Sequence, residues 1–364
     1  MIICTNKMEY PLRSPRQRIQ KQAMVTNEKG RVSLLFKKAL ISRGSVDAVS
    51  QQMSSHPQYL ESFLRAQHYI LHMDGPLPLP CRHYIAIMAA AQHHCNYLVY
   101  LHSAQFLRLG GDPLWLQGLE AAPPRLRLLD HINKVLAHQP WLTACSHIKS
   151  LDSTGDVVCL KERIQRSQEE RDKLQTLQQS GKHEELKCSD VEEEEEMMCF
   201  ADPSRFITDP NFYYQDFARR DDDHFQVFRA QDYSWEDHGF SLVNRLYSDI
   251  GHLLDDRFRS VTALSLQHSP DLKRAIWNYI HCVLGIRYDD YDYGEVNQLL
   301  ERDLKLFVKA VACFPDPTKT PACPLSWAPL KPSERIHVNL LIMEARLQAE
   351  LLYALRAITQ YMIA

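Results

Sequence analysis

A thiol and an imidazole lie seven residues apart in the most apolar segment of the chain. This segment, residues 82–111, reads RHYIAIMAAAQHHCNYLVYLHSAQFLRLGG and carries Cys95 and His102. One continuous helix would place the two side chains about 20° apart on one face, because seven residues make nearly two turns. A base or cation near a thiol favours the thiolate, so the pair could form a redox centre. The alternative, two ordinary core residues, stays open at this level.

The overall composition indicates a helical globular protein. The chain has 364 residues, of which 45% are hydrophobic and 24% are charged, and only 12 are glycine. Many Leu, Ala, Gln, Glu and Arg residues favour helix. We therefore predict an all-α fold of two helical lobes. The net charge of −3 gives no indication of a nucleic-acid partner.

The same apolar segment is long enough to raise the question of a membrane span. Within Tyr84–Leu107, however, His93, His94, Asn96 and other polar residues interrupt the pattern. We expect a buried core helix and no membrane insertion. Ten cysteines without a CxxC pair, behind a start that does not resemble a signal peptide, favour reduced thiols in the cytoplasm or the nucleus. We predict no metal site and no cofactor.

Composition divides the chain into four segments. We predict a disordered tail over residues 1–30, a helical lobe over 31–150, a polar linker over 151–199 and a second helical lobe over 200–364. The linker contains the acidic run VEEEEEMM, which is either solvated or a docking tail. The second lobe ends in a long amphipathic pattern, predicted to be a helix over residues 335–362.

Three motifs within these lobes resemble the sestrin family. They are RHYIAIMAAA from residue 82, RAIWNYIHCV from residue 274 and HVNLL from residue 337. The resemblance covers roughly residues 30–149 and 200–364. It implies two helical lobes of the alkylhydroperoxidase and carboxymuconolactone decarboxylase type. It also implies a stress-induced intracellular regulator that binds leucine and inhibits the GATOR complex, which otherwise supports TOR kinase signalling.

A peroxide-reducing activity of the first lobe is the alternative function that the resemblance implies. It would use Cys95 as attacking thiolate, Tyr97 as hydrogen-bond donor or proton relay, and His102 as general base. Leu98 stands where alkylhydroperoxidases carry a second cysteine, so no local thiol is available to resolve a sulfenic acid. Cys81 and Cys145 are possible substitutes. On a straight helix Tyr97 would point away from Cys95.

The second lobe would hold the amino acid. The resemblance assigns the ammonium to Glu334, the carboxylate to Lys273, a lid to Trp327, an apolar wall to Leu272 and hydroxyls to Ser260 and Ser269. The best-known leucine-binding sestrin has Arg in place of Lys273, and Lys offers a point charge instead of a bidentate fork. Arg257 stands where the family has a small threonine. We therefore expect leucine binding to be weakened or lost.

Two further expectations concern the partner and the first lobe. The Asp289–Asp290 pair is either a contact for the GATOR complex, as the resemblance implies, or a solvated acidic loop. After a predicted helix over residues 130–137, sestrins continue with another helix pair, and this chain runs into the polar linker instead. A helical scaffold without either activity is the third possibility.

Overall fold

The computed structural model describes residues 21–43, 46–152, 202–216, 232–247, 249–264, 270–286, 293–314 and 331–363. Throughout these residues the regular structure is helical, with no strand, which confirms the all-α prediction. The helices are α1 (Lys21–Arg43), α2 (Ala48–Gln52), α3 (Pro57–His72), α4 (Leu79–Gln92), α5 (Asn96–Arg108), α6 (Pro124–His138), α7 (Cys145–Asp152), α10 (Phe240–Leu246), α11 (Ile250–Ala263), α12 (Pro270–Val283), α13 (Tyr293–Leu299), α14 (Arg302–Cys313) and α15 (Pro332–Ile363). Short helical turns add η1 (Met53–Ser55), η2 (Pro113–Gln117), η3 (Leu119–Ala121), η4 (Pro140–Leu142), η5 (Pro203–Phe206) and the π-helical η6 (Trp235–Gly239).

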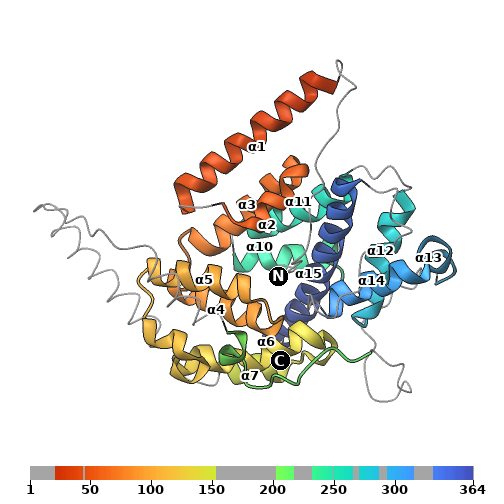
Figure 1. Cartoon of the computed structure of the whole chain (residues 1–364). Helices are drawn as coiled ribbons and strands as arrows, with labels where there is room; N and C mark the ends of the chain where they lie inside the picture. The colour runs from red at the N-terminus through yellow and green to blue at the C-terminus, as the bar shows by residue number, and fades with distance from the viewer. Residues whose placement is uncertain are drawn as a thin grey trace, which may run out of the picture.

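The last helix, α15, is the element around which much of the molecule packs. It spans 32 residues, which include the whole predicted range 335–362, and it contacts α6, α7, α11, α12 and α14 (Figure 1). Val338, Leu341, Ala345 and Leu352 on it are at most 1% exposed. Burial of apolar surface from several neighbours stabilises a helix of this length far more than intrinsic propensity does.

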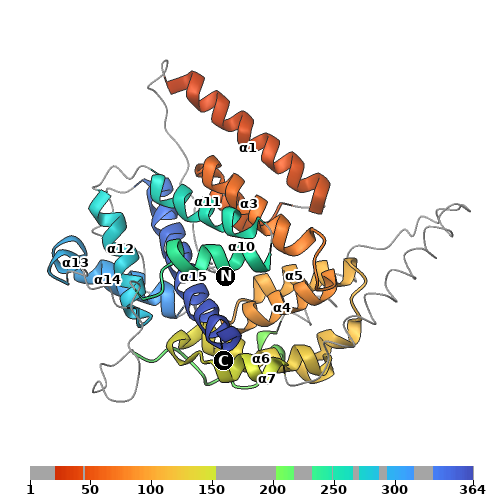
Figure 2. The ribbon, with the colours of Figure 1, turned by 180° about the vertical axis from the view of Figure 1, so that it is seen from behind.

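The first hydrophobic core joins an early helix to the second half of the chain. Tyr59, Leu60 and Phe63 of α3 belong to the same buried cluster as Phe258 and Val261 of α11. Both ribbon views show α3 beside α11 (Figures 1 and 2). The division of the chain at residues 150 and 200 stays a prediction about its folding units.

Helix α1 lies at the edge of this core and packs against α3 (Figure 2). It begins at Lys21, within the segment for which the sequence predicts a disordered tail. Its exposed apolar residues include Leu34, Leu40 and Ile41.

The second hydrophobic core is formed by α4, α5 and α6 with residues from beyond the linker. Tyr84 is fully buried, and its ring lies 5.8 Å from the rings of Phe106 and Trp115 and 6.0 Å from that of Phe206. Phe206 and Ile207 therefore help to close the first lobe although they follow the linker in sequence.

The two cores meet at a buried arginine of α15. Arg346 is 1% exposed and donates to the backbone carbonyls of Ala312 and Ala137, at the ends of α14 and α6. Its Nε also donates to Glu350 over 2.7 Å. Arg346 thus connects α6, α14 and α15. It donates to carbonyl groups at helix ends, which have no hydrogen-bond partner within their own helix.

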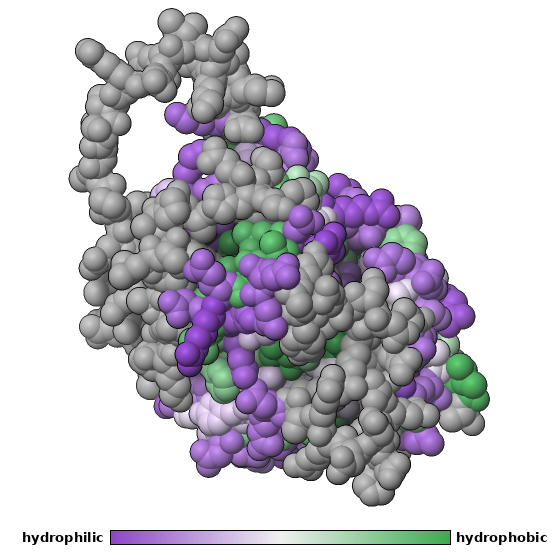
Figure 3. Space-filling model, turned by 90° about the vertical axis from the view of Figure 1, so that its right-hand side faces the viewer, coloured by the Kyte–Doolittle hydropathy of each residue, from purple (hydrophilic) through white to green (hydrophobic). Residues whose placement is uncertain are grey.

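The surface on the side of α12 to α14 has an apolar recess. Figure 3 shows apolar side chains lying deeper than the polar side chains around them. Among the helices described here, none combines the length and the hydrophobicity needed to cross a bilayer. The segment 84–107 is largely buried, as the sequence predicts, but it forms two helices, α4 and α5, where the sequence predicts one.

Candidate functional site

The apolar segment around Cys95 forms a helical hairpin instead of one helix. Helix α4 ends at Gln92, α5 begins at Asn96, and His94 between them has a φ of 50°. The predicted continuous helix is therefore wrong, and so is the 20° relation between Cys95 and His102. The polar run HHCN offers no apolar face at this point, and the turn lets α4 and α5 pack against each other.

Cys95 occupies the N-cap of α5. Its Sγ accepts a hydrogen bond from the backbone N–H of Leu98 over 3.4 Å, and the side chain is 3% exposed. The sulfur is disulfide-bonded in this structure. Cys81 and Cys145, the two suggested substitutes for a resolving cysteine, form no disulfide in this structure.

Tyr97 faces a neighbouring helix. Its hydroxyl accepts a hydrogen bond of 2.8 Å from the backbone N–H of Ala48, in the first turn of α2. Burial raises the pKa of the phenol, so it is protonated at neutral pH. The contact fixes α2 on the hairpin and makes Tyr97 a link between the two elements.

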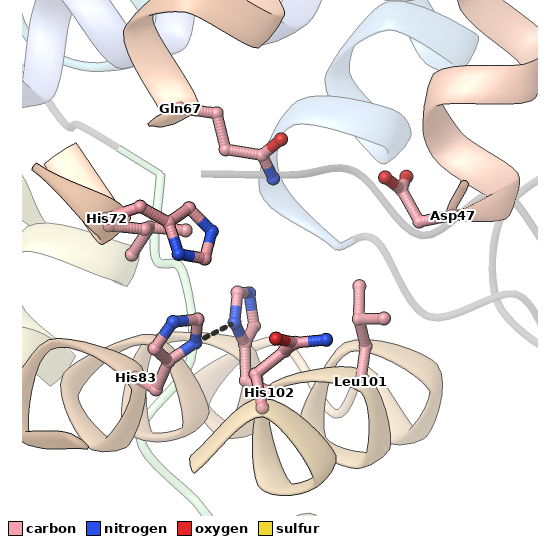
Figure 4. A pocket seen from close by; sticks show the side chains of 8 residues that line it. Asp47, Gln67, His72, His83, Leu101 and His102 are labelled. Atoms are coloured by element: carbon pink, nitrogen blue, oxygen red, sulfur yellow. Dashed lines mark hydrogen bonds between the residues drawn. The ribbon is translucent and has the colours of Figure 1, made fainter. Parts of the chain in front are cut away.

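His102 pairs with a histidine that the sequence analysis did not single out. Its Nδ1 lies 3.2 Å from Nδ1 of His83 on α4, and the dashed line in Figure 4 marks this contact. His102 has no hydrogen bond to Cys95 or Tyr97 among the residues described. The structure thus does not join the three predicted catalytic side chains into one bonded set.

The two imidazoles lie in a cavity between α3, α4 and α5. His72 and Gln67 of α3 point toward them from one side, and Asp47 faces the cavity from the other (Figure 4). Burial lowers the pKa of His102 to about 4, although the charge of Asp47 acts in the opposite direction. Burial and the neighbouring His102 lower the pKa of His83 to about 3. Both rings are neutral at pH 7, and because burial penalises the imidazolium, each is a weaker base than a free imidazole.

Glu334 lies in the first turn of α15. The side chain is 7% exposed, and its Oε2 accepts a hydrogen bond of 2.8 Å from the backbone N–H of Lys331. A carboxylate at this position also interacts favourably with the helix dipole. Glu334 therefore stabilises the start of α15, and this role is compatible with the ligand contact that the resemblance implies for it.

The charges of Glu334 and Lys273 both affect a buried histidine, His337. His337 of α15 is fully buried, and its Nε2 lies 2.8 Å from the carbonyl oxygen of Val261 on α11. Burial is the main reason that its pKa falls to about 4; the charge of Lys273 lowers it further, and that of Glu334 raises it. Lys273 on α12 and Glu334 on α15 therefore both affect the pKa of His337.

Lys273 closes the end of α11. Its Nζ donates to the carbonyl oxygens of Thr262, over 2.5 Å, and Leu264, over 3.0 Å. An ammonium has three N–H groups, so one remains for another acceptor. Leu272 beside it is half-buried and packs against the first core, in keeping with a wall position.

Ser260 and Arg257 point toward α3 and α15. The hydroxyl of Ser260 lies 2.9 Å from that of Ser62 and donates to the carbonyl of Arg257. Arg257 is 6% exposed and donates to Oε1 of Glu344 over 2.6 and 3.1 Å. The sequence suggested a long cation in place of a small pocket residue, whereas the structure shows Arg257 held in a buried ion pair.

That ion pair has two further partners. The hydroxyl of Tyr59 donates to the same Oε1 of Glu344, and the guanidinium of Arg257 lies 5.1 Å from the centre of the Phe63 ring. Although burial lowers the pKa of Arg257, Glu344 and Tyr59 raise it more, so the charge persists. Sequence reasoning missed Glu344, and the only signal was a charged residue within the buried pattern of α15.

Four predicted site residues lie outside the described residues. They are Trp327, Ser269, Asp289 and Asp290. Their assigned roles stay predictions.

Comparison with known proteins places this geometry in a family. The family described as PA26 p53-induced protein (sestrin) matches residues 14–157 and 150–362. Sestrin-3 of Mus musculus is 43% identical over 422 aligned positions, which cover 88% of this chain and 86% of that protein. Sestrin-2 of Homo sapiens is 42% identical over 416 positions (89% and 86%). Sestrin-1 of Macaca fascicularis is 40% identical over 437 positions (93% and 88%). The chain belongs to the sestrin family.

The comparisons also bear on the missing helix pair. The family match consists of two ranges that overlap at residues 150–157. The 422 aligned positions with Sestrin-3 exceed the 364 residues of this chain, so that relative carries residues without a counterpart here. The shortened first lobe stays a prediction.

Proposed function

We propose that this sestrin is a regulator that senses a free amino acid, leucine first of all, and restrains TOR signalling by binding the GATOR complex. Membership in the sestrin family supports the general role of a sestrin for this chain. The amino-acid site and the partner are proposals about this chain. The cytoplasm, with the nucleus as a second location, is the compartment in which such a regulator would act.

The observation that carries the proposal is a nearly buried carboxylate, Glu334 in the first turn of α15, together with the ammonium of Lys273 at the end of α11. A free amino acid needs an anion for its ammonium and a cation for its carboxylate. Glu334 is nine-tenths buried and offers the anion, and Lys273 retains one N–H for the carboxylate. His337 is neutral at pH 7, so it competes with neither charge.

The remaining proposed contacts surround these two groups. Leu272 and Ser260 would line the site, and Trp327 and Ser269 would complete it. In this proposal Arg257 contributes no contact to the ligand, because its guanidinium is bound to Glu344.

Calorimetric titration of leucine into the full chain tests the amino-acid site. We expect saturable binding that Glu334→Gln weakens about tenfold to a hundredfold, because a hydrogen bond between charged groups is lost. The matched control is Glu120→Gln, since Glu120 has a side chain that is 86% exposed. Equal binding by wild type and Glu334→Gln would refute this site, and so would no binding to either.

The partner surface is proposed to include Asp289 and Asp290. Two adjacent carboxylates form a compact anionic patch that a basic partner surface would match. Capture of the GATOR complex by the wild-type chain is expected to fall when both residues are changed to Ala. The control pair is Asp202→Ala and Asp209→Ala, two exposed or half-buried acids elsewhere in the chain. If the Asp289 and Asp290 double variant captures as much as wild type, this contact is wrong.

A thiol peroxidase is the second candidate, and the position of Cys95 at the start of α5 favours it. A helix N-terminus lowers the pKa of a cysteine, and the Leu98 N–H already points at the sulfur. In the reduced protein the thiolate would attack one peroxide oxygen and release the other as water or alcohol. The resulting sulfenic acid would condense with a second thiol, giving a disulfide and water.

Trapping of the sulfenic acid in the reduced protein tests this candidate. Addition of peroxide is expected to label Cys95, with slower labelling in His102→Ala, because His102 would accept the thiol proton. Cys145→Ser is the control and is expected to label as wild type does, since Cys145 is free and half-buried elsewhere. If Cys95 is labelled equally fast in wild type and in His102→Ala, Cys95 is an ordinary thiol.

A further inference from the structure

Two histidines face each other where α7 meets α6, away from both of the sites proposed above. His131 lies on α6, and His147 lies in the first turn of α7. Helix α7 packs against α6 and against α15 (Figure 1). His131 is exposed and His147 is half-buried, so small solutes can reach this pair. In this respect it differs from His83 and His102, which are both buried.

The two rings turn their Nε2 edges toward each other. The Nε2 atoms of His131 and His147 are 3.1 Å apart, whereas the ring centres are 4.9 Å apart and the ring planes are inclined by 23°. Because the two nitrogen atoms are closer than the two centres, the Nε2 positions converge. Zinc binds imidazole nitrogen at about 2.0–2.1 Å in tetrahedral geometry, which places two such nitrogens about 3.3 Å apart. The observed separation is close to that of two ligands on one ion.

A second observation concerns the other ring nitrogen of His147. Its Nδ1 lies 3.0 Å from the backbone nitrogen of Ala144 and 3.2 Å from the carbonyl oxygen of the same residue. When Nδ1 accepts from this N–H, the ring proton is on Nε2 and faces His131. When Nδ1 carries the proton, it donates to the carbonyl, and Nε2 presents its lone pair. The second tautomer is the one that metal-ligating histidines adopt when Nδ1–H donates to a backbone carbonyl.

The charges near the pair are compatible with neutral rings. Burial lowers the pKa of His131, the charges of His147 and Lys134 lower it further, and that of Asp130 raises it. His131 is therefore neutral at pH 7, as a metal ligand must be. Within the part of the chain that the structure describes, no third His, Cys, Asp or Glu joins the two histidines as a ligand.

We propose that His131 and His147 bind one divalent transition metal ion, of the zinc and copper class, through their Nε2 atoms. The proton of His147 moves from Nε2 to Nδ1, which donates to the carbonyl of Ala144, and the ion replaces the hydrogen bond between the rings. Imidazole suits zinc and copper, and water would complete the coordination. The bound ion would fasten α7 to α6. No sequence motif indicates this site, because the two histidines are 16 residues apart on different helices.

Hydrogen exchange of the full reduced chain, with and without zinc, tests this proposal. The amides of α7 (Cys145–Asp152) are followed by mass spectrometry. Zinc is supplied at about ten times the Kd that equilibrium dialysis gives for the wild-type chain. Exchange in α7 is expected to slow about tenfold, because an ion that binds only the closed arrangement makes opening rarer by a factor of one plus the ratio of free ion to Kd. Magnesium at the same concentration is expected to have no effect, because it prefers oxygen ligands.

His131→Gln decides the result, since it removes one ligand and keeps the contacts of His147 with Ala144. This variant is expected to bind one zinc ion fewer and to lose the slowing in α7. The control is His252→Gln, at an exposed histidine of α11 whose ring packs against Phe240, and it is expected to behave as wild type does. If His131→Gln loosens α7 by itself, the ratio of its exchange rates with and without zinc still decides.

Zinc that binds to thiols elsewhere in the chain would be counted by dialysis but would not slow α7. Equal slowing by zinc in wild type and in His131→Gln would overturn the proposal. No slowing in wild type at a zinc concentration that saturates the chain would overturn it as well.

Discussion

The α4–α5 hairpin and the interface of α11 with α15 both bury polar groups, but they treat charge in opposite ways. In the hairpin, His83 and His102 contact each other, and burial keeps both neutral at pH 7. At the interface, Arg257 and Glu344 form a charged pair with Tyr59. One region holds titratable groups that the fold keeps neutral, and the other holds groups that must remain charged.

The difference indicates what each region is suited for. A neutral imidazole pair beside a cavity can donate and accept hydrogen bonds without charge, and burial makes each ring a weaker base than a free imidazole. A buried ion pair with fixed charges cannot do this, but it penalises any arrangement in which one partner is missing. We infer that the ion pair keeps α3, α11 and α15 in register next to the proposed amino-acid site.

The largest expected effect comes from removing one charge of the buried pair. Glu344→Leu would leave the Arg257 guanidinium buried without a partner, and the free energy of unfolding should fall by about 3–5 kcal/mol. Urea denaturation followed by circular dichroism measures this change.

Two further variants sharpen that result. Arg257→Leu combined with Glu344→Leu should recover most of the loss, because no charge is then left unpaired. Arg65→Ala, which removes an exposed ion pair with Asp256, should cost less than about 1 kcal/mol. A loss for Glu344→Leu as small as that of Arg65→Ala would show that the two regions do not differ as described.

An intermediate effect is expected at Lys273. Lys273→Arg would add a bidentate fork while keeping donors for the two carbonyls at the end of α11. Leucine should bind about tenfold more tightly, which corresponds to 1.4 kcal/mol. Competition between labelled and unlabelled leucine measures the ratio, and weaker binding by the Arg variant would argue against a carboxylate contact here.

The smallest effect is a pH dependence of stability from the hairpin. The folded-state pKa of His83, about 3, lies below its ordinary value near 6.5. The contribution of His83 to the free energy of unfolding is therefore complete above pH 6.5. It declines as the pH falls from 6.5 toward 3, because over this range only the unfolded chain gains a proton at His83. Between pH 6.5 and 5.5 this amounts to about 1 kcal/mol.

His83→Gln should remove that part of the slope. The free energy of unfolding, measured in urea at both pH values, is the observable. His131→Gln is the control at a more exposed histidine. Identical slopes in wild type and His83→Gln would mean that the hairpin histidine is not held neutral by the fold.

Sequence reasoning predicted the elements with regular patterns and missed the contacts between them. The long amphipathic pattern predicted α15. The break before Cys95 was missed, although the polar run HHCN was visible. His83 lies 19 residues from His102 and Arg257 lies 87 from Glu344. No local pattern contains pairs at such separations, because the packing of α4 on α5 and of α11 on α15 creates them.

The central claim, that this sestrin couples an amino acid to a partner through α11, α12 and α15, is tested most directly by one measurement. The GATOR complex is captured by the wild-type chain and by Glu334→Gln, each with and without leucine, and the captured amount is quantified. The account predicts that leucine changes the amount captured by wild type and has no effect on Glu334→Gln. An equal leucine effect in both chains, or none in wild type, would contradict it.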